Sequence, residues 1–526
     1  PTLAIVVERE EKINSFVSQK YWEVVADVQV KAGQYKAQWF DPNFKKVEGN
    51  AHLKAERLWD KSSALALCEK INGKVATAEE TAKRTTQLSP LLFDLTSLQR
   101  EANNRFGFSA KVTLAAAQAL YEKHKALTYP RTDARALPED YRSTVLSTLE
   151  VLSHSESYAE SAKAIIKAQW VKPTKRVFDN TKISDHFAII PTPQLPKKLS
   201  EVEQKIYDLV AKRFMAVFYP AAEYDVTTRI TTVEGEKFKT EGKVLVKAGW
   251  LKVYGREGEN EETLVPIDNG ETGQVSDVSV IEKQTKAPPR YTEATLLSAM
   301  EGAGKLLEEG ELREAMAGKG LGTPATRAAI IEGLLLQNYL VRDGRDLKPT
   351  FKARQLFVLL KGLGVSELSE PELTGEWEYK LAQIEQGKMT RETFMKEIRQ
   401  MTETIVAAAK QYEGDTVPID NPAHLQVPCP KCGSEIVENY RRFACTRCDF
   451  SLSKNPGGRT FEVAEVEELL KNRVVGPLDG FVSKMGKPFS AILRISQDFK
   501  LEFDFGSKSD DDDEVIDCLL YTSPSP

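Results

Sequence analysis

The sequence predicts a multidomain α+β protein in which helical domains and a β-rich domain precede a zinc ribbon. Two β-rich stretches, residues 21–88 and 221–285, flank a helical stretch at 89–220, and together they can form one discontinuous domain. Two helix pairs with glycine-containing links have a winged-helix outline, and four cysteines near the C-terminus have the spacing of a zinc site. Because 526 residues exceed what one hydrophobic core usually serves, several domains are expected.

The composition argues against a membrane protein and leaves nucleic acid open as a partner. The chain is 41% hydrophobic and 28% charged, and no apolar run reaches the roughly 18 to 20 residues that span a bilayer. It also lacks a signal peptide and a disulfide-type cysteine pattern, so we predict a cytoplasmic protein with no membrane partner. The net charge of −5 equals the five negative charges of residues 510–514, so it does not exclude a DNA-binding surface.

Both ends of the sequence have the character of cut ends. The chain opens on Pro1 without a methionine and enters an apolar helical stripe at once, so upstream sequence is expected. Residues 1–20 are expected to begin a helical domain. The tail 507–526 is expected to be acidic and disordered, and its residues 517–524 resemble translated sequencing-adapter read-through, to which we assign no function.

The β-rich hinge domain is predicted from alternating apolar and polar residues. Residues 21–40 alternate on both sides of Gly33, which predicts two strands. The stretch 224–281 alternates in the same way and has hairpin signals at Gly235 and Gly270. A long helical insertion would therefore separate the two halves of this domain.

Helix signals are clear in the inserted domain. Thr96–Phe106 has an apolar stripe, Gly107 can end that helix, and Ser109 can cap the next one, over residues 110–124. A helix, a glycine turn and a second helix lead to an extended segment that begins at Leu127. This order is typical of a helix-turn-helix unit.

A similar order recurs in residues 286–415, which we predict to be a winged-helix-like DNA-binding domain. Helices are expected at Thr292–Met300 and Pro324–Leu336, followed by a hairpin around Asp343-Gly344. Two such units favour DNA, but helix pairs with glycine turns also occur in proteins that bind no nucleic acid. The pattern alone does not decide the partner.

The strongest local motif predicts a zinc ribbon at residues 425–455. Cys429-x2-Cys432 and Cys445-x2-Cys448 provide four thiolates in two turns, as tetrahedral zinc requires. Structural zinc is favoured over catalytic zinc because four protein ligands leave no open position for water. Redox use of the cysteine pairs is the alternative.

Basic and aromatic residues are mixed on this ribbon. Arg441, Arg442 and Arg447 with Tyr440 and Phe443 suit stacking on single-stranded bases. The alternative is that the aromatic side chains form the small core of the ribbon, and we favour it for Phe443.

A second motif, Leu127-Thr-Tyr-Pro-Arg-Thr-Asp133, predicts a nucleophile. Pro130 favours an extended Tyr129, so Tyr129 and Arg131 can point to the same side. A phenol with a pKa of about 10 needs adjacent positive charge to attack phosphorus, and Arg131 can supply it. For an isolated Tyr-Pro-Arg a surface turn with a buried tyrosine would be the better interpretation, and the rest of the chain reverses that preference.

Other residues argue against a histidine metal site and an ATP site. Alone, His186 would be interpreted as a structural histidine, and none of the five histidines has relaxase-type or zincin-type metal spacing. Gly302-Ala-Gly304-Lys305 lacks the earlier glycine of a phosphate loop, so no ATP site is predicted.

Together these segments resemble the type IA DNA topoisomerase family over almost the whole chain. Residues 1–10 resemble the segment after the family's Toprim domain, and 93–99 the entry to its nucleophile-bearing domain. Residues 127–133 resemble its active-site strand, which implies that Tyr129 forms a 5′-phosphotyrosine and Arg131 holds the phosphate. The Tyr-Pro-Arg form favours the topoisomerase III kind.

The resemblance also implies further site residues. His186 matches the histidine of the family's His-x-Ala-Ile-Ile-Pro-Thr segment, which implies that it places the scissile phosphate. Residues 289–294 and 320–327 resemble single-strand-binding segments, and 480–489 resembles a C-terminal repeat that we place in a domain at 456–506. The implied DNA-binding residues are Arg290, Thr323, Thr326, Arg327, Lys484 and Lys487.

The implied activity is transient cleavage of one DNA strand, strand passage and religation without ATP, on a toroidal core. Structural Zn²⁺ and catalytic Mg²⁺ are the implied cofactors, with the Mg²⁺ ligands on a Toprim domain expected upstream of Pro1. Single-stranded DNA, a helicase or a single-strand-binding protein are the implied partners, in a bacterial nucleoid. Without that domain we expect no activity, and the alternative is a non-catalytic single-stranded-DNA-binding remnant. A tyrosine recombinase would need an arginine and histidine cluster that the sequence lacks.

Overall fold

The computed structural model describes most of the chain in two compact units. The described residues are 1–47, 49–255, 264–306, 320–365, 368–411, 422–439, 441–483 and 487–505. The first unit comprises Pro1–Ala353 with Glu370–Ala382, and the second comprises Arg354–Ser369 with Gln383–Pro526. Within the described residues, no helix combines the length and apolar character that a membrane span requires.

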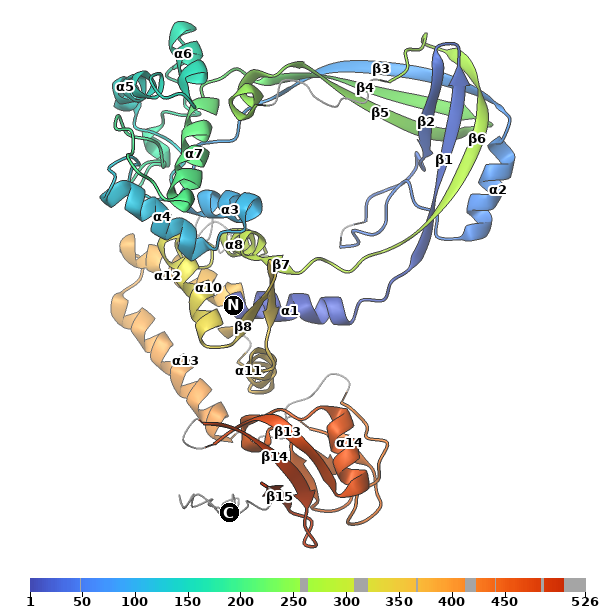
Figure 1. Ribbon diagram of the computed structural model, residues 1–526, viewed down its shortest axis with the longest axis vertical. Helices are drawn as coiled ribbons and strands as arrows, with labels where there is room; N and C mark the ends of the chain where they lie inside the picture. The colour runs from blue at the N-terminus through green and yellow to red at the C-terminus, as the bar shows by residue number, and fades with distance from the viewer. Residues whose placement is uncertain are drawn as a thin grey trace. The chain divides into compact units, whose positions relative to one another are not determined.

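A closed six-stranded barrel forms one part of the first unit, with strand order β1-β2-β5-β4-β3-β6 (Figure 1). In the sequence, β1, β2 and β3 precede the helical insertion, and β4, β5 and β6 follow it. Their bounds are β1 Lys20–Val30, β2 Gly33–Trp39, β3 Val75–Gln87, β4 Ala222–Val233, β5 Glu236–Lys247 and β6 Glu271–Gln284. Helix α2, Lys61–Ile71, packs on β1 and β6. The two distant β-rich stretches therefore share one apolar core.

The turns of the barrel differ in part from the sequence prediction. Gly235, with φ of 84°, lies in the tight turn between β4 and β5, as predicted. Gly33 opens β2 and pairs with Val30 instead of lying in the turn. The hairpin predicted at Gly270 is wrong, because residues 264–268 form no strand, and the Gly270 amide donates to the Ala78 carbonyl at 2.9 Å. That turn therefore docks on β3 before β6 begins.

The helical domain between β3 and β4 has its own apolar core. Its helices are α3 Leu95–Phe106, α4 Ala110–Glu122, α5 Arg142–Leu152, α6 Ala159–Lys167 and α7 Glu201–Ala216. Gly107 ends α3 with φ of 72°, where a side chain would be strained. The Ser109 hydroxyl accepts a hydrogen bond from the Val112 amide and caps α4. Both helix-boundary predictions are confirmed.

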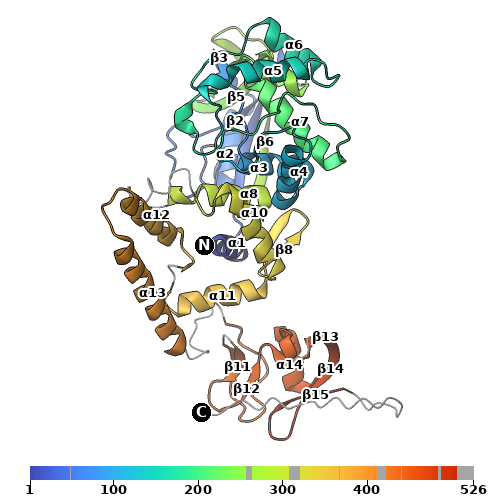
Figure 2. The same cartoon turned by 90° about the vertical axis from the view of Figure 1, so that its left-hand side faces the viewer.

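A third region of the first unit has the predicted helices and hairpin. Its elements are α1 Thr2–Asn14, β7 Tyr291–Thr292, α8 Glu293–Glu301, α10 Pro324–Leu336, β8 Leu340–Asp343 and β9 Asp346–Pro349. The strands form a small sheet in the order β7-β9-β8. Helix α8 packs against α3, and α10 packs against α4 (Figure 2). This α8–β9 region thus lies directly against the helical domain.

The second unit ends in two three-stranded sheets that share one apolar core. The first sheet contains β10 Ile436–Glu438, β11 Arg442–Cys445 and β12 Ser451–Ser453, and the second contains β13 Val474–Val482, β14 Pro488–Ile495 and β15 Leu501–Asp504. Helix α14, Val463–Asn472, packs on the second sheet. Helices α11 Phe351–Gly362 and α13 Arg391–Gln411 belong mainly to this unit, whereas most of α12 Pro371–Glu385 belongs to the first unit.

Candidate active site and zinc centre

The segment that carries Tyr129 follows α4 and is held in an extended form. Leu127 forms an isolated bridge with Pro191, and the Thr128 amide donates to the Ile190 carbonyl at 3.0 Å. Burial alternates along the segment, with Thr128, Pro130, Thr132 and Ala134 buried and Tyr129, Arg131 and Asp133 more exposed. The phenol and the guanidinium therefore lie on the more exposed side of one short extended segment, as its spacing predicted.

The structure brings His186 into contact with Tyr129. Their ring centroids are 4.3 Å apart and tilted by 44°. The Thr132 hydroxyl donates to the His186 carbonyl at 2.9 Å, which ties the histidine backbone to the Tyr129 segment. This tie fixes His186 beside the phenol although its side chain is exposed.

Tyr129 and Arg131 are free to meet a ligand. Among the described residues, the Tyr129 hydroxyl makes no hydrogen bond and the Arg131 guanidinium forms no ion pair. The Arg131 side chain is exposed. A phenol and a guanidinium are side chains of the kinds that can act as a nucleophile and bind a phosphate oxygen.

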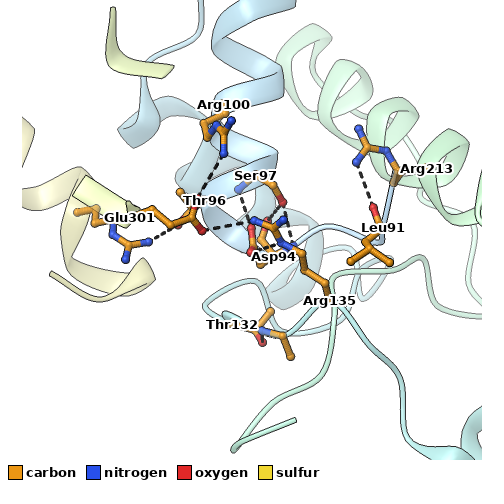
Figure 3. Close-up of polar contacts among 11 residues, drawn as sticks. Leu91, Asp94, Thr96, Ser97, Arg100, Thr132, Arg135, Arg213 and Glu301 are labelled. Carbon is orange, nitrogen blue, oxygen red and sulfur yellow. Dashed lines mark hydrogen bonds and ion pairs between the residues drawn. The ribbon is translucent and has the colours of Figure 1, made fainter. Parts of the chain in front are cut away.

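A charged network, which was not predicted from the sequence, connects Arg135, close after this segment, to α3 and α8 (Figure 3). Asp94, at the N-terminus of α3, accepts hydrogen bonds from the Ser97 amide and from Arg135, both at 2.6 Å. Arg135 and Arg100 both reach the carboxylate of Glu301, at 3.4 and 3.3 Å. The network therefore joins the active-site segment to α3 and to the end of α8.

Electrostatics keep Arg135 charged in this network. Burial lowers the pKa of Arg135, but the Asp94 carboxylate outweighs that effect and the net pKa is raised. One local signal marks Asp94 in the sequence, its place as a possible helix N-cap before Leu95. The partners Arg135 and Glu301 are too distant in sequence for a local pattern to pair them.

Arg327, which was expected from the sequence to contact DNA, has a buried side chain in this structure. Its side chain is buried, at 1% exposure, and donates to the Leu321 carbonyl at 3.2 Å and to the Thr96 hydroxyl at 2.8 Å. Burial lowers the pKa of Arg327 against opposing carboxylates. In this conformation Arg327 joins α10 to α3, and a phosphate contact would require it to leave that position.

The other predicted residues of the α8–β9 region are positioned by local contacts. Arg290 forms a two-pronged ion pair with Glu10, both distances being 2.9 Å. Thr323 and Thr326 are exposed and cap the start of α10 reciprocally. Gly320 permits the tight approach before them, because a Cβ there would lie 2.3 Å from the Met300 carbonyl oxygen.

The four cysteines of the ribbon converge on one point. All their sulfur atoms lie within 4.8 Å of one another, with Cys429–Cys448 at 3.6 Å and Cys432–Cys445 at 3.4 Å. A tetrahedral zinc ion with Zn–S bonds of about 2.3 Å separates its sulfurs by roughly 3.8 Å. Hydrogen bonds from Ser434 lower the pKa of Cys432 to about 6, which favours the ligating thiolate. The cluster fits structural zinc.

On the ribbon, the described aromatic side chain is buried and the arginines are exposed. Phe443 is 1% exposed and belongs to the apolar core, so the core interpretation is confirmed. Arg441, Arg442 and Arg447 are exposed. Tyr440 lies outside the described residues.

Of the two lysines predicted to contact DNA in the C-terminal repeat, one can be located. Lys487 is exposed immediately before β14 begins at Pro488. Lys484 lies outside the described residues.

Comparisons with known proteins agree with this geometry. Residues 1–396 match the family described as DNA topoisomerase, and residues 447–506 match the C-terminal repeat of topoisomerase. DNA topoisomerase 3 of Bacillus cereus is 38% identical over 456 residues, and that of Bacillus subtilis is 37% identical over 453 residues; each match covers 83% of this chain and 59% of the relative. This chain therefore spans less than two thirds of the length of these relatives.

A solved structure shows the same fold. Full-length topoisomerase I from Thermotoga maritima superposes with a TM-score of 0.58 at 23% identity, covering 87% of this chain and 70% of that one. The sequence match to the family extends over three quarters of the chain, from the first helix to α13. The chain is a member of the type IA DNA topoisomerase family.

Proposed function

We propose that this chain is the strand-cleaving and DNA-holding part of a topoisomerase III-like enzyme. The Tyr129 oxygen attacks the phosphorus of one strand, the bond to the 3′ oxygen breaks, and the phosphate stays on Tyr129 as a 5′-phosphotyrosine. The tyrosine proton is lost and the leaving 3′ oxygen gains one. The carrying observation is the unbonded phenol of Tyr129, in ring contact with His186 and two residues from the exposed Arg131.

The ester that forms stores the energy of the broken bond. Reversal of the same step by the 3′ hydroxyl therefore reseals the strand without ATP, in agreement with the absence of a phosphate-loop motif from the sequence. Arg131 would hold a non-bridging oxygen of the phosphate, and His186 would orient the phosphate beside the phenol. Both roles use groups that reach the surface beside Tyr129.

The resemblance places the ligands of a catalytic Mg²⁺ on a Toprim domain. When bound, that ion would neutralise charge on the phosphate. Among the described residues, the one cluster that fits a metal ion is the four cysteines. On this proposal Tyr129, Arg131 and His186 provide the nucleophile and the phosphate-holding groups of the site.

Strand passage requires an opening, and the construction of the helical domain supports one. The domain is inserted between β3 and β4 of the barrel, and the segment Gly249–Tyr254 after β5 packs into its core, so the connections from these strands can act as a hinge (Figure 1). Its contacts with the α8–β9 region include buried polar ones: the Ala110 amide donates to the Glu293 carboxylate at 2.7 Å, and the Ala294 amide donates to the Asn103 side-chain oxygen at 3.1 Å. Polar contacts of this kind can exchange with water when two domains separate.

The C-terminal sheets support a grip on single-stranded DNA. On the second sheet Phe489 and Phe505 have ring centroids 5.6 Å apart, and Phe505 is 57% exposed. The exposed Lys487 adds a positive charge immediately before β14, whereas Arg494 on that strand is paired with Asp504 at 2.8 Å. Aromatic rings with adjacent cations suit stacked bases and their phosphates. A helicase or single-strand-binding protein as partner, and a nucleoid location, stay predictions.

The second candidate is a non-catalytic single-stranded-DNA-binding remnant. It is supported by the exposed arginines of the ribbon, Arg441, Arg442 and Arg447, which suit contacts with phosphates. The two candidates share the DNA-binding surfaces and differ in whether Tyr129 forms an ester.

Covalent trapping separates these candidates. Single-stranded DNA labelled at its 3′ end would be incubated with Mg²⁺ and either this chain or the chain extended at its N-terminus by a Toprim domain. We expect a labelled adduct with the extended protein, none with Tyr129→Phe, and an undiminished adduct with the control Tyr219→Phe. DNA labelled at its 5′ end should release a free labelled fragment. Absence of an adduct from the extended protein would leave the binding remnant.

A further inference from the structure

A cavity of about 410 Å³ lies beside Tyr121, the aromatic residue at the end of α4. Its size falls in the range of sites that take small organic ligands. All of its walls belong to the helical domain that carries Tyr129. The lining residues are Tyr121, Lys125, Leu127, Thr192, Pro193 and Gln194.

The cavity is connected to the nucleophile by one ring contact. The centroids of Tyr121 and Tyr129 are 5.4 Å apart, with the rings nearly perpendicular at 78°. His186 makes a separate contact with Tyr129 at 4.3 Å. A ligand in the cavity would thus touch Tyr121 and lie one aromatic ring away from the phosphate on Tyr129.

The two walls of the cavity are hydrogen-bonded to each other. The Thr192 hydroxyl donates to the Lys125 carbonyl at 2.5 Å, and the Thr192 amide donates to the Ala126 carbonyl at 3.0 Å. Lys125 itself has φ of 52°, which turns the chain sharply after α4. The cavity is therefore largely formed before any ligand enters, which lowers the entropic cost of binding.

The lining has the chemistry of a nucleotide site. Tyr121 is half-buried and offers an aromatic surface on which a base can stack, and the exposed Gln194 offers an amide for the edge of a base. The Lys125 ammonium lies 5.8 Å from the Tyr121 ring centroid, and no carboxylate pairs with it among the described residues. Exposed Lys197 and Lys198 follow shortly after the lining residue Gln194. These cations favour a ligand that carries phosphate.

We propose that this cavity binds a nucleotide on the 3′ side of the scissile phosphate, in the strand that stays joined to Tyr129 after cleavage. The proposal rests on the proposed function. A single ester leaves that strand free to rotate, whereas a base stacked on Tyr121 and a phosphate held by Lys125 add a second attachment on the same domain. The 5′ phosphate would then remain aligned for religation while the domain moves.

Photocrosslinking tests occupancy without requiring cleavage. Single-stranded DNA containing 5-iododeoxyuridine would be irradiated with the Tyr129→Phe form of this chain, and the modified peptide identified by mass spectrometry. We expect crosslinks on the peptide that contains Tyr121, and fewer with Tyr121→Leu. Crosslinks confined to other peptides would overturn the proposal. If Tyr121 crosslinks but the extended protein forms no adduct, the proposed function fails and the nucleotide site stands.

Binding measurements locate the nucleotide. Oligonucleotides with one abasic position at each of the first three places 3′ of the mapped cleavage site would be titrated by fluorescence anisotropy against the extended Tyr129→Phe protein. One position should weaken binding about tenfold, as loss of one stacked base does. Tyr121→Leu should weaken binding to intact DNA by a similar factor and remove the dependence on that position, and Tyr121→Phe should retain both. An unchanged abasic profile in Tyr121→Leu would contradict the proposal.

The lysine provides a second, independent variant. Lys125→Gln should weaken binding and lower the dependence of log affinity on log salt concentration by about one. Lys167→Gln, at an exposed lysine at the end of α6, is the matched control and should leave both unchanged. Equal effects of the two substitutions would show that Lys125 acts only through net charge and would contradict a defined site.

Discussion

The interior of the helical domain and its face toward the α8–β9 region are built on different principles. The interior consists of apolar side chains such as Leu98, Leu120 and Phe214, each fully buried. The face adds charged and polar contacts, among them Arg135–Glu301 at 3.4 Å and Arg327 to Thr96 at 2.8 Å, to the apolar packing of Ala110. Exposing apolar area costs roughly 25 cal/mol per Å², whereas polar groups regain hydrogen bonds to water. The proposed function requires this difference, because the helical domain has to stay folded while its face separates.

The largest effect is expected in the interior. Phe214→Ala leaves a cavity in the helical domain and should lower its free energy of unfolding by about 3 to 5 kcal/mol. Denaturant unfolding, followed by the fluorescence of Trp170 and Trp250, measures this change. Leu146→Ala, at a residue 40% exposed on α5, is the control and should change it by about 0.5 kcal/mol or less. Similar losses for both variants would mean that the domain is not stabilised by this core.

An intermediate effect on stability is expected at Asp94, which caps α3 in the helical domain and also pairs with Arg135 at the face. Asp94→Asn keeps an oxygen to cap α3 but removes the charge that pairs with Arg135, and we expect a loss of about 2 kcal/mol. Hydrogen exchange should show faster exchange of amides in the first turn of α3. If that turn exchanges at the unaltered rate, Asp94 is only a cap.

A small effect on stability is expected at the face itself. Glu301→Gln weakens two half-exposed ion pairs, and we expect about 1 kcal/mol or less, with no change in the unfolding of the helical domain. The change should appear as a larger fraction of open molecules, measured as the distance between fluorophores on α5 and α10. Glu201→Gln, which removes a surface ion pair with Lys205 on α7, is the matched control. A lower midpoint of unfolding for Glu301→Gln would show that Glu301 stabilises the helical domain itself and not only its face.

Local chemistry explains which parts of the fold could be predicted. The helix end at Gly107, the cap at Ser109 and the hairpin around Asp343-Gly344 depend on residues adjacent in sequence, and the structure agrees at each. The Gly270 hairpin failed because its turn pairs with β3, nearly two hundred residues earlier in the chain, as the contact with Ala78 shows. Turn signals alone do not identify which strand a turn will meet.

In the candidate site, too, features that depend on local spacing could be predicted and features that depend on distant contacts could not. The common side of Tyr129 and Arg131 follows from the period of an extended chain, and the zinc cluster follows from cysteine spacing. The burial of Arg327 and the network around Glu301 depend on side chains that meet across sequence separations of 166 residues or more. Tyr121 was missed because nothing in a helix-ending Leu-Tyr-Glu indicates that the ring will contact Tyr129.

The most direct test of the account is to identify the residue that carries the DNA. The adduct formed by the extended protein would be digested with trypsin and nuclease, and the modified peptide sequenced by mass spectrometry. We predict a nucleotide joined through its 5′ phosphate to Tyr129. A modification on any other residue, or a link through a 3′ phosphate, would contradict the assignment of Tyr129 as the nucleophile.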